Sequence, residues 1–172
     1  ALRQCTTCFD LQLGHAVRPS LLFSDYVYTT GSNPGLVRHF GKLAAECLGA
    51  APSAIGFKVG PPDMVVEVGM NDGSLLQHFL DAGCSVVGID PARSIADEAS
   101  HWGIQTIVDY FGTATVRRPE MAHFVGSTKL VLATNVFAHV PDLHDFVEAV
   151  KTLLAPDGVF LFEVAWAVPQ IE

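Results

Sequence analysis

The alternation of short apolar runs with amphipathic segments from Met64 onward most constrains what this chain can fold into. Each apolar run is long enough for one buried strand, and each amphipathic segment places its apolar residues on one helical face. Strands that are apolar on both faces are typical of a parallel sheet with helices on both sides. The pattern therefore predicts a Rossmann-like α/β sandwich. The predicted strands cover 64–69, 85–90, 104–111, 129–137 and 159–165, and the predicted helices cover 74–83, 92–103 and 143–154.

Two of the predicted helices are specified in more detail. The helix over 92–103 is expected to turn Ile95, Ala96, Ala99 and Trp102 toward the core. The helix over 143–154 has the most regular apolar repeat, and Asp142 is placed to be its N-cap. A Pro-Asp-Gly sequence at 156–158 then predicts a turn into the last strand.

The first 62 residues follow a different pattern. Cys5 and Cys8 form a Cys-x-x-Cys pair, an aromatic segment covers 23–28, and a polar turn covers 29–35. The amphipathic stretch after it predicts a leader helix that packs on the α/β core, with 52–62 as its connector. We divide the chain into an N-terminal segment with an aromatic linker, a leader helix with its connector, and the α/β core. These units are 1–30, 31–62 and 63–172.

Composition excludes several classes of function. The chain has 172 residues, of which 49% are hydrophobic, and this suits one domain with a substantial core. Its net charge of -8 argues against nucleic acid as a partner, since phosphate binding needs clustered Lys and Arg. No apolar run approaches the roughly 18 residues of a membrane span, and no signal peptide is visible. We therefore expect a cytoplasmic protein with no membrane partner.

The turn after the first core strand, with the sequence EVGMNDGSLL over 67–76, predicts a cofactor site. Gly69 and Gly73 allow positive φ and close approach of a ligand. A dinucleotide fingerprint has three glycines, whereas this turn has two, with Asn71 and Asp72 between them. Asp72 would also repel a pyrophosphate. The simplest alternative is that the two glycines only close a tight strand–helix connection.

S-adenosylmethionine suits this turn better, because it has no phosphate and carries a sulfonium and an α-amino group. Glu67 and Asp72 supply negative charge for that end of the cofactor. Asp90 follows the second strand, where an acidic side chain binds ribose hydroxyls, and NAD enzymes share this feature. An oxidoreductase with a dinucleotide-binding domain is therefore one alternative, and a non-catalytic α/β domain is another.

Several motifs together resemble the sugar C-methyltransferases of deoxysugar biosynthesis. They are EVGMNDGSLL, GIDPA at 88–92, ATNVFAHVPDLHDFVEAV at 133–150 and LLAPDGVFLFEV at 153–164. Upstream, CTTCFDLQLGH and LFSDYVYTTGS resemble the end of that family's zinc-binding region and its link to the core. The resemblance extends from Cys5 to about Val168. It implies a class I methyltransferase fold and S-adenosylmethionine-dependent methylation of a carbon beside a ketone, on a nucleotide-linked keto-deoxysugar.

The resemblance also implies roles for individual residues. His139, in NVFAHVPD, is expected to stabilise an enolate or to assist proton transfer. Tyr28 is expected near the methyl group, whereas Tyr26 is interpreted as a core residue. Asn135 is expected beside the cofactor. An acceptor oxygen or nitrogen remains possible, because the cofactor turn does not determine the acceptor.

Two features of the family are only partly present in the sequence. Family members bind zinc through two cysteine pairs, and Cys5 and Cys8 provide one of them. Cys47 and Cys84 are interpreted as buried core residues. The sequence starts with Ala and stops soon after the last predicted strand, so we expect a fragment without the last strands and the C-terminal domain, which supplies a base. Such a fragment could bind cofactor without completing the reaction.

Overall fold

The computed structural model of the chain describes residues 2–51 and 56–165. Its centre is a five-stranded sheet in the order β5-β4-β3-β6-β7, and every pair of neighbouring strands is parallel. The predicted parallel α/β sandwich is therefore confirmed. The strands are β3 (Met64–Val68), β4 (Ser85–Ile89), β5 (Gln105–Ile107), β6 (Thr128–Thr134) and β7 (Leu154–Glu163).

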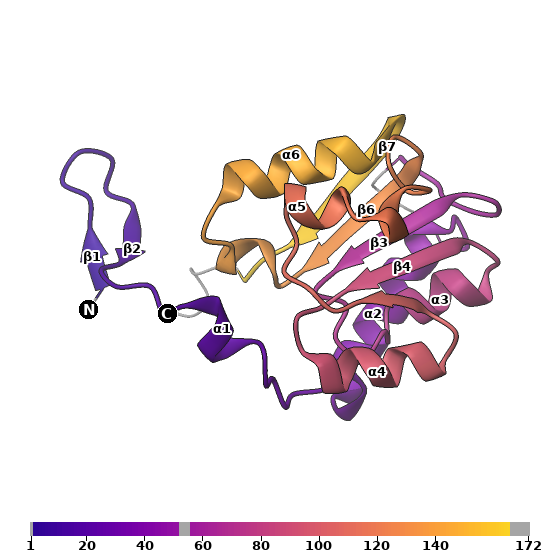
Figure 1. Cartoon of the computed structure of the whole chain (residues 1–172), viewed down its shortest axis with the longest axis horizontal. Helices are drawn as coiled ribbons and strands as arrows, with labels where there is room; N and C mark the ends of the chain where they lie inside the picture. Colours follow the sequence, from indigo (N-terminus) through magenta and orange to yellow (C-terminus); the bar gives the residue numbers. More distant parts are fainter. Residues whose placement is uncertain (1, 52–55, 166–172) are drawn as a thin grey trace.

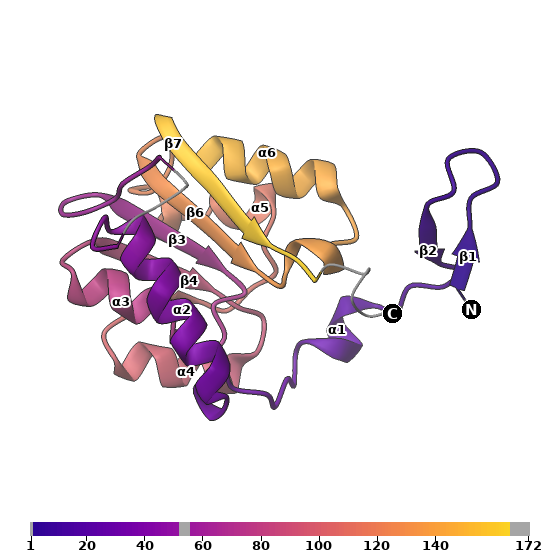
Figure 2. The ribbon, with the colours of Figure 1, turned by 180° about the vertical axis from the view of Figure 1, so that it is seen from behind.

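Helices cover both faces of the sheet (Figures 1 and 2). Alternate strand residues point to opposite faces, so that Val65 packs in one core cluster and Val66 in the other. One face is covered by α2 (Pro34–Cys47), α3 (Leu76–Asp81) and α4 (Arg93–His101). The other is covered by α5 (Thr113–Val116), the short 3-10 helix η2 (Pro119–Met121) and α6 (Leu143–Leu153).

Side-chain caps fix where two of these helices begin. Asn33 Oδ1 accepts hydrogen bonds from the backbone N–H groups of Gly35 and Leu36, and Pro34 occupies the first position of α2. The α2 helix then buries Phe40 and neighbouring residues against the sheet, as the leader-helix prediction requires. Asp142 accepts a hydrogen bond from the Asp145 N–H, which confirms its predicted capping role.

The N-terminal residues lie outside the sandwich. A short hairpin of β1 (Leu2–Gln4) and β2 (Leu11–Leu13) stands apart from the body in Figure 1. It is followed by α1 (Pro19–Leu22) and by the 3-10 helix η1 (Thr30–Ser32), which leads into α2. We call residues 18–31 the strap, because they run from the hairpin to the start of α2 past the carboxyl ends of the strands.

Three predicted strand boundaries were wrong. The strand predicted over 104–111 covers only Gln105–Ile107, and the strand predicted over 129–137 stops at Thr134. A 3-10 helix, η3 (Phe137–His139), follows that strand instead. The predicted turn at 156–158 lies inside β7 as an irregularity, where the pairing with β6 shifts between Thr128 and Leu130.

The predicted inner face of two helices also needs correction at its margins. Ile95, Ala96 and Ala99 are buried as predicted, but the side chain of Trp102 is 69% exposed. Trp102 follows the last turn of α4, where the chain already leaves the sheet. In α6, two residues of the predicted apolar repeat, Leu143 and Val147, are also exposed, whereas Phe146, Val150 and Leu153 are buried.

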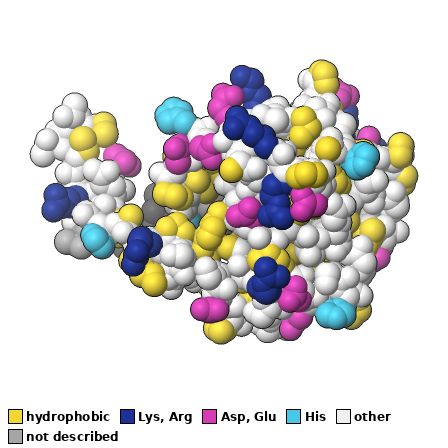
Figure 3. Space-filling model, viewed as in Figure 1, with side chains coloured by type: hydrophobic (Ala, Val, Ile, Leu, Met, Phe, Trp, Pro, Cys, Tyr) yellow, Lys and Arg dark blue, Asp and Glu magenta, His cyan; other side chains and the backbone are white. Residues whose placement is uncertain are grey.

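Within the residues that the structure describes, no helix is long and apolar enough to cross a membrane. Figure 3 shows Lys and Arg side chains dispersed among acidic ones over the visible face rather than gathered into one patch.

We expect substitutions at buried and at exposed positions to differ sharply in their effect on the free energy of unfolding. Leu132→Ala should lower the free energy of unfolding by about 2–5 kcal/mol, because Leu132 is fully buried and its truncation leaves a cavity. Trp102→Ala should change it by no more than about 0.5 kcal/mol, because most of that side chain is in solvent. Urea denaturation followed by circular dichroism measures both values. A loss at Trp102 as large as at Leu132 would contradict the arrangement of the core.

Candidate active site

A cavity of about 810 Å³ lies at the carboxyl ends of β3, β4 and β6 and continues under the strap. Its size is that of a small-molecule site, and its position at the carboxyl edge of a parallel sheet is where ligands bind in open α/β folds. In Figure 3, hydrophobic side chains gather where the N-terminal segment meets the body. The predicted site residues that line it are Tyr28, Glu67, Gly69, Asn71, Asp90, Asn135 and His139.

The turn from β3 to α3 brings backbone close to the cavity. Gly69 has a φ of 66°, a left-handed conformation that glycine adopts at little cost. The N–H of Gly69 donates to the carbonyl of Ile89 at 2.7 Å, which joins the turn to the end of β4. A Cβ atom on Gly69 would also collide with Val136. Both the backbone and its neighbour therefore require glycine here.

Gly73 is required by packing, and its predicted contact with the cofactor stays a prediction. Its φ is 77°, and an added Cβ would lie 2.5 Å from Ile104 Cδ1 and 3.2 Å from Ala99 Cβ. Gly73 thus lets α3 approach α4 and the core, and it is not among the residues that line the cavity. The structure places it as a packing residue.

Glu67 is the most unusual residue of the cavity. Glu67 lines the cavity, and its side chain is only 1% exposed. Its Oε2 has no hydrogen-bond partner among the described residues. Burial, and then the negative charges of Asp72 and Asp90, raise the pKa of this carboxyl well above its usual value. A buried carboxylate oxygen without a hydrogen-bond partner is costly, so a ligand with a positively charged donor would relieve that cost.

Asp90 is held in a fixed orientation at the end of β4. Its Oδ2 accepts the N–H of Asn71 at 3.0 Å, and its Oδ1 accepts the N–H of Ala92 at 2.8 Å. Burial raises the pKa of this carboxyl, and the two N–H groups oppose that shift. Each carboxylate oxygen keeps a second lone pair, so Asp90 could accept two hydroxyl donors.

The side chains of Asn71 and Asp72 have partners within the chain, and their predicted contacts with the cofactor stay predictions. Both carry hydrogen bonds to the strap, and Asp72 is absent from the cavity lining. The spacing of the turn suggested a ligand for these groups, whereas their partners are backbone atoms about 40 residues earlier in the sequence. No local pattern could have identified such partners.

The strap contributes three aromatic side chains to the cavity wall. Phe23 packs edge-on against Tyr26, and Tyr26 packs edge-on against Tyr28. The interpretation of Tyr26 as a core residue was wrong, because it is 41% exposed and lines the cavity. The Tyr110 hydroxyl lies 3.1 Å from Ser24 Oγ, which ties the strap to the loop after β5.

His139 and Asn135 lie on the segment after β6. Asn135 adopts a φ of 58°, which Asn tolerates better than most residues, and its N–H donates to the carbonyl of Glu163 at 2.7 Å. The residues after it form η3, so that the ring of His139 lies 6.1 Å from the ring of Phe23 on the strap. Histidine and strap therefore meet across the cavity.

Several lining residues were missed by the sequence analysis. Asp109 follows β5 at the same edge at which Asp90 follows β4, and that position was a usable signal. Arg18, on the strap, had no such signal, because only the folded chain brings it to the cavity. Asp142 and Asp145, at the start of α6, also line it.

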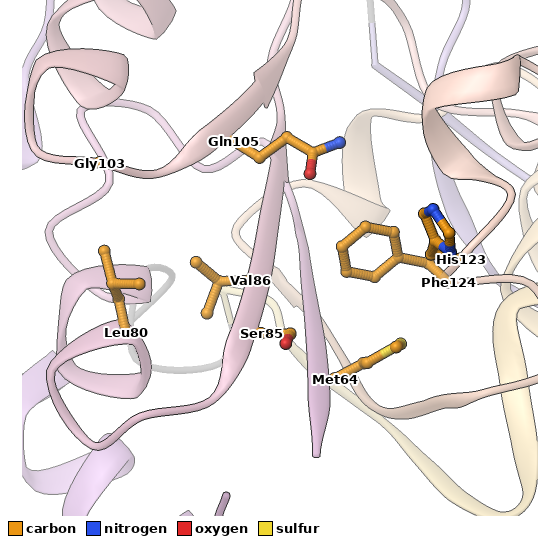
Figure 4. A pocket seen from close by; sticks show the side chains of 8 residues that line it. All are labelled: Met64, Leu80, Ser85, Val86, Gly103, Gln105, His123 and Phe124. Atoms are coloured by element: carbon orange, nitrogen blue, oxygen red, sulfur yellow. The ribbon is translucent and has the colours of Figure 1, made fainter. Parts of the chain in front are cut away.

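A second cavity of about 410 Å³ lies at the opposite edge of the sheet, where β3, β4 and β5 begin (Figure 4). Its wall includes Met64, Val86 and Phe124, together with Gln105 and His123. It is remote from the carboxyl edge, and none of the predicted site residues lines it.

The Cys-x-x-Cys pair lies in the turn of the β1–β2 hairpin. The backbone N–H groups of Cys8 and Thr7 lower the pKa of the Cys5 thiol, a setting that favours thiolate. In the described ranges 2–51 and 56–165, no three or more His, Cys, Asp or Glu side chains gather as a metal site. Two thiols suit half of a zinc site, so zinc remains a prediction. Cys47 and Cys84 are buried as predicted, and burial raises the pKa of Cys47 to about 11.

The chain belongs to the methyltransferase domain family, whose model matches residues 40–170. This membership decides against the oxidoreductase alternative. The C-methyltransferase NovU of Streptomyces niveus is 40% identical over 168 residues, which are 98% of this chain but 38% of NovU. The chain thus spans less than two fifths of that relative. A ubiquinone biosynthesis O-methyltransferase of Actinobacillus pleuropneumoniae is 30% identical over 108 residues, which are 57% of this chain and 44% of that protein.

Solved structures agree with the family assignment at the level of the fold. The geranyl diphosphate C-methyltransferase of Streptomyces coelicolor A3(2) matches with a TM-score of 0.55 and 17% identity, over 81% of this chain and 58% of the other.

Replacement of the buried Glu67 should make the unliganded protein more stable. A raised pKa means that folding favours the protonated acid, so its stabilisation is present below the unfolded pKa, near 4.5, and is lost as pH rises through the folded pKa. Glu67→Gln should therefore raise the free energy of unfolding at pH 8 by about 1–3 kcal/mol and have less effect at pH 4.5.

Denaturant titrations of both proteins at the two pH values test this. Glu98→Gln, an exposed position on α4, is the matched control. A Glu67→Gln protein that is less stable than the original chain at pH 8 would contradict the view of Glu67 as a strained, ligand-facing group.

Proposed function

We propose that the chain is the cofactor-binding part of an S-adenosylmethionine-dependent C-methyltransferase that acts next to the ketone of a nucleotide-linked keto-deoxysugar. The buried Glu67 carboxyl group, whose Oε2 has no hydrogen-bond partner among the described residues, is the observation that carries the cofactor proposal. It favours a ligand that brings positive charge and disfavours one that brings phosphate. Membership of the methyltransferase family supports the same cofactor.

The residues of the site suit this cofactor one by one. When bound, S-adenosylmethionine supplies an electrophilic methyl group on a sulfonium sulfur. Glu67 would take its ammonium group, and Asp90, already oriented by two N–H groups, would accept its ribose hydroxyls. Gly69 lets the backbone approach closely, and Asn135 borders the same end of the cavity.

Methylation of carbon requires more than a cofactor pocket. The acceptor carbon beside a ketone must lose its proton to form an enolate, and that carbon then bonds to the methyl group while the sulfur keeps the electron pair of the broken bond. A nearby base or donor accelerates this step. His139 and Tyr28 both line the cavity, so we assign them to proton transfer and to alignment of the acceptor, respectively.

Carbon is preferred over oxygen as the acceptor because of the extent of similarity. The C-methyltransferase NovU matches nearly all of this chain, whereas the O-methyltransferase matches 57% of it. The keto-deoxysugar itself rests on the resemblance of motifs that run from the hairpin to the end of β7.

Cofactor identity is testable on this chain alone. We expect S-adenosylhomocysteine to bind in the micromolar range by calorimetry and NAD not to bind. Asp90→Asn should weaken the affinity at least tenfold, because it exchanges a charge-assisted acceptor for a neutral amide. Asp97→Asn, on the exposed side of α4, is the control. Binding of NAD in place of S-adenosylhomocysteine would refute the proposal.

The acceptor is testable with the full-length protein and a nucleotide-linked keto-deoxyhexose. Transfer of a ¹³C-labelled methyl group should give a product whose methyl carbon is bonded to carbon by NMR. His139→Gln should lower kcat about 10²–10⁴-fold with little change in cofactor affinity, because the loss falls on proton transfer. His144→Gln, five residues later in the first turns of α6, is the control. A methyl group on oxygen would reassign the enzyme to O-methylation.

A further inference from the structure

The strap is fastened to the cofactor turn by the two side chains that break the dinucleotide fingerprint. Asn71 Oδ1 accepts the N–H of Thr30 at 2.8 Å, and Asn71 Nδ2 donates to the carbonyl of Tyr28 at 2.8 Å. The side-chain amide of Asn71 therefore pairs with one backbone donor and one backbone acceptor of the strap, as a neighbouring β-strand would. Both partners belong to the segment that bears Tyr28.

Asp72 adds a third attachment beside the first two. Its Oδ2 accepts the N–H of Gly31 at 2.7 Å, while its Oδ1 accepts both the N–H and the hydroxyl of Ser74 at 3.1 and 2.6 Å. The hydrogen bonds from Ser74 thus fix the orientation in which the Asp72 carboxylate accepts the strap N–H. A Cβ atom on Gly31 would lie 3.1 Å from Asp72 Oδ2, so the strap fits closely against this group.

The conformation of Asn71 makes this arrangement possible. Its φ of 54° is left-handed, and Asn is one of the few residues other than glycine that adopt it readily. The Asn71 N–H meanwhile donates to Asp90 Oδ2. A single residue therefore joins the strap on one side to the predicted ribose-binding carboxylate on the other.

We propose that Asn71 and Asp72 are positioning residues: they clamp the strap at residues 28–31 and thereby place Tyr28 over the cofactor end of the cavity. This inference rests on the proposed function for the part that concerns the cofactor, whereas the clamp itself does not depend on it. Thr30, one of the clamped residues, is 5% exposed and lines the cavity, so the clamped backbone forms part of the cavity wall.

Hydrogen exchange of the unliganded chain tests the clamp. Asn71→Gly keeps the left-handed backbone at little cost and removes both side-chain hydrogen bonds. The amide of Thr30, which loses its acceptor, should then exchange roughly tenfold faster, while the amides of β3 and β6 keep their protection. Asn33→Gly, which removes the cap of α2, is the matched control, and it should affect residues 35–36 rather than 30–31. Unchanged exchange at Thr30 in Asn71→Gly would overturn the clamp.

Calorimetry with S-adenosylhomocysteine tests the positioning role. Asn71→Gly should weaken its binding at least fivefold, and Asn33→Gly should not. Asn71→Asp, which keeps the acceptor for Thr30 but loses the donor to Tyr28, should fall between the two. Equal affinity in Asn71→Gly and the original chain would overturn the positioning role. If the original chain does not bind S-adenosylhomocysteine, the proposed function fails, while the exchange experiment still decides the clamp.

Discussion

The parallel pairing of β3 with both β4 and β6 is the constraint on which the site depends. Parallel strands end at the same edge of a sheet, so the residues that follow them meet there although the chain separates them widely. Gly69, Asp90 and Asn135 each follow one of these three strands within two residues. Burial of both faces fixes the register, since a shift by one residue would turn each strand's side chains to the opposite face.

The same edge concentrates negative charge in a low-dielectric setting. Glu67 lies fully buried with the carboxylates of Asp72 and Asp90 near enough to raise its pKa. Nothing in the described fold requires a carboxylate at this buried position, and an apolar residue would pack there without its cost. The arrangement is understandable as a stability cost that a cationic ligand offsets, which is how strained groups persist at functional sites.

Much of this could be predicted from sequence, for a physical reason. Strand and helix periodicity arises from burial, so the order of elements, the covered sheet, and Asp142 as a cap all follow from local pattern. The ends of β5 and β6 did not follow, because apolar residues such as Phe111 and Phe137 continue past the last strand pairing and pack beside α6. The prediction that Trp102 is buried was wrong for a similar reason, since periodicity does not indicate where a helix leaves the core.

The departures from the dinucleotide fingerprint show a different limit. Spacing identified the turn, but it could not say whether the side chains of Asn71 and Asp72 face a ligand or another part of the chain. Their partners at 28–31 lie at the end of the irregular stretch that follows α1 and at the start of η1, so the path of the chain there is set by these hydrogen bonds rather than by its own periodicity. A turn of three glycines would leave the strap without this attachment. Asn71 and Asp72 therefore belong to a turn that both borders the cavity and holds the strap in place beside it.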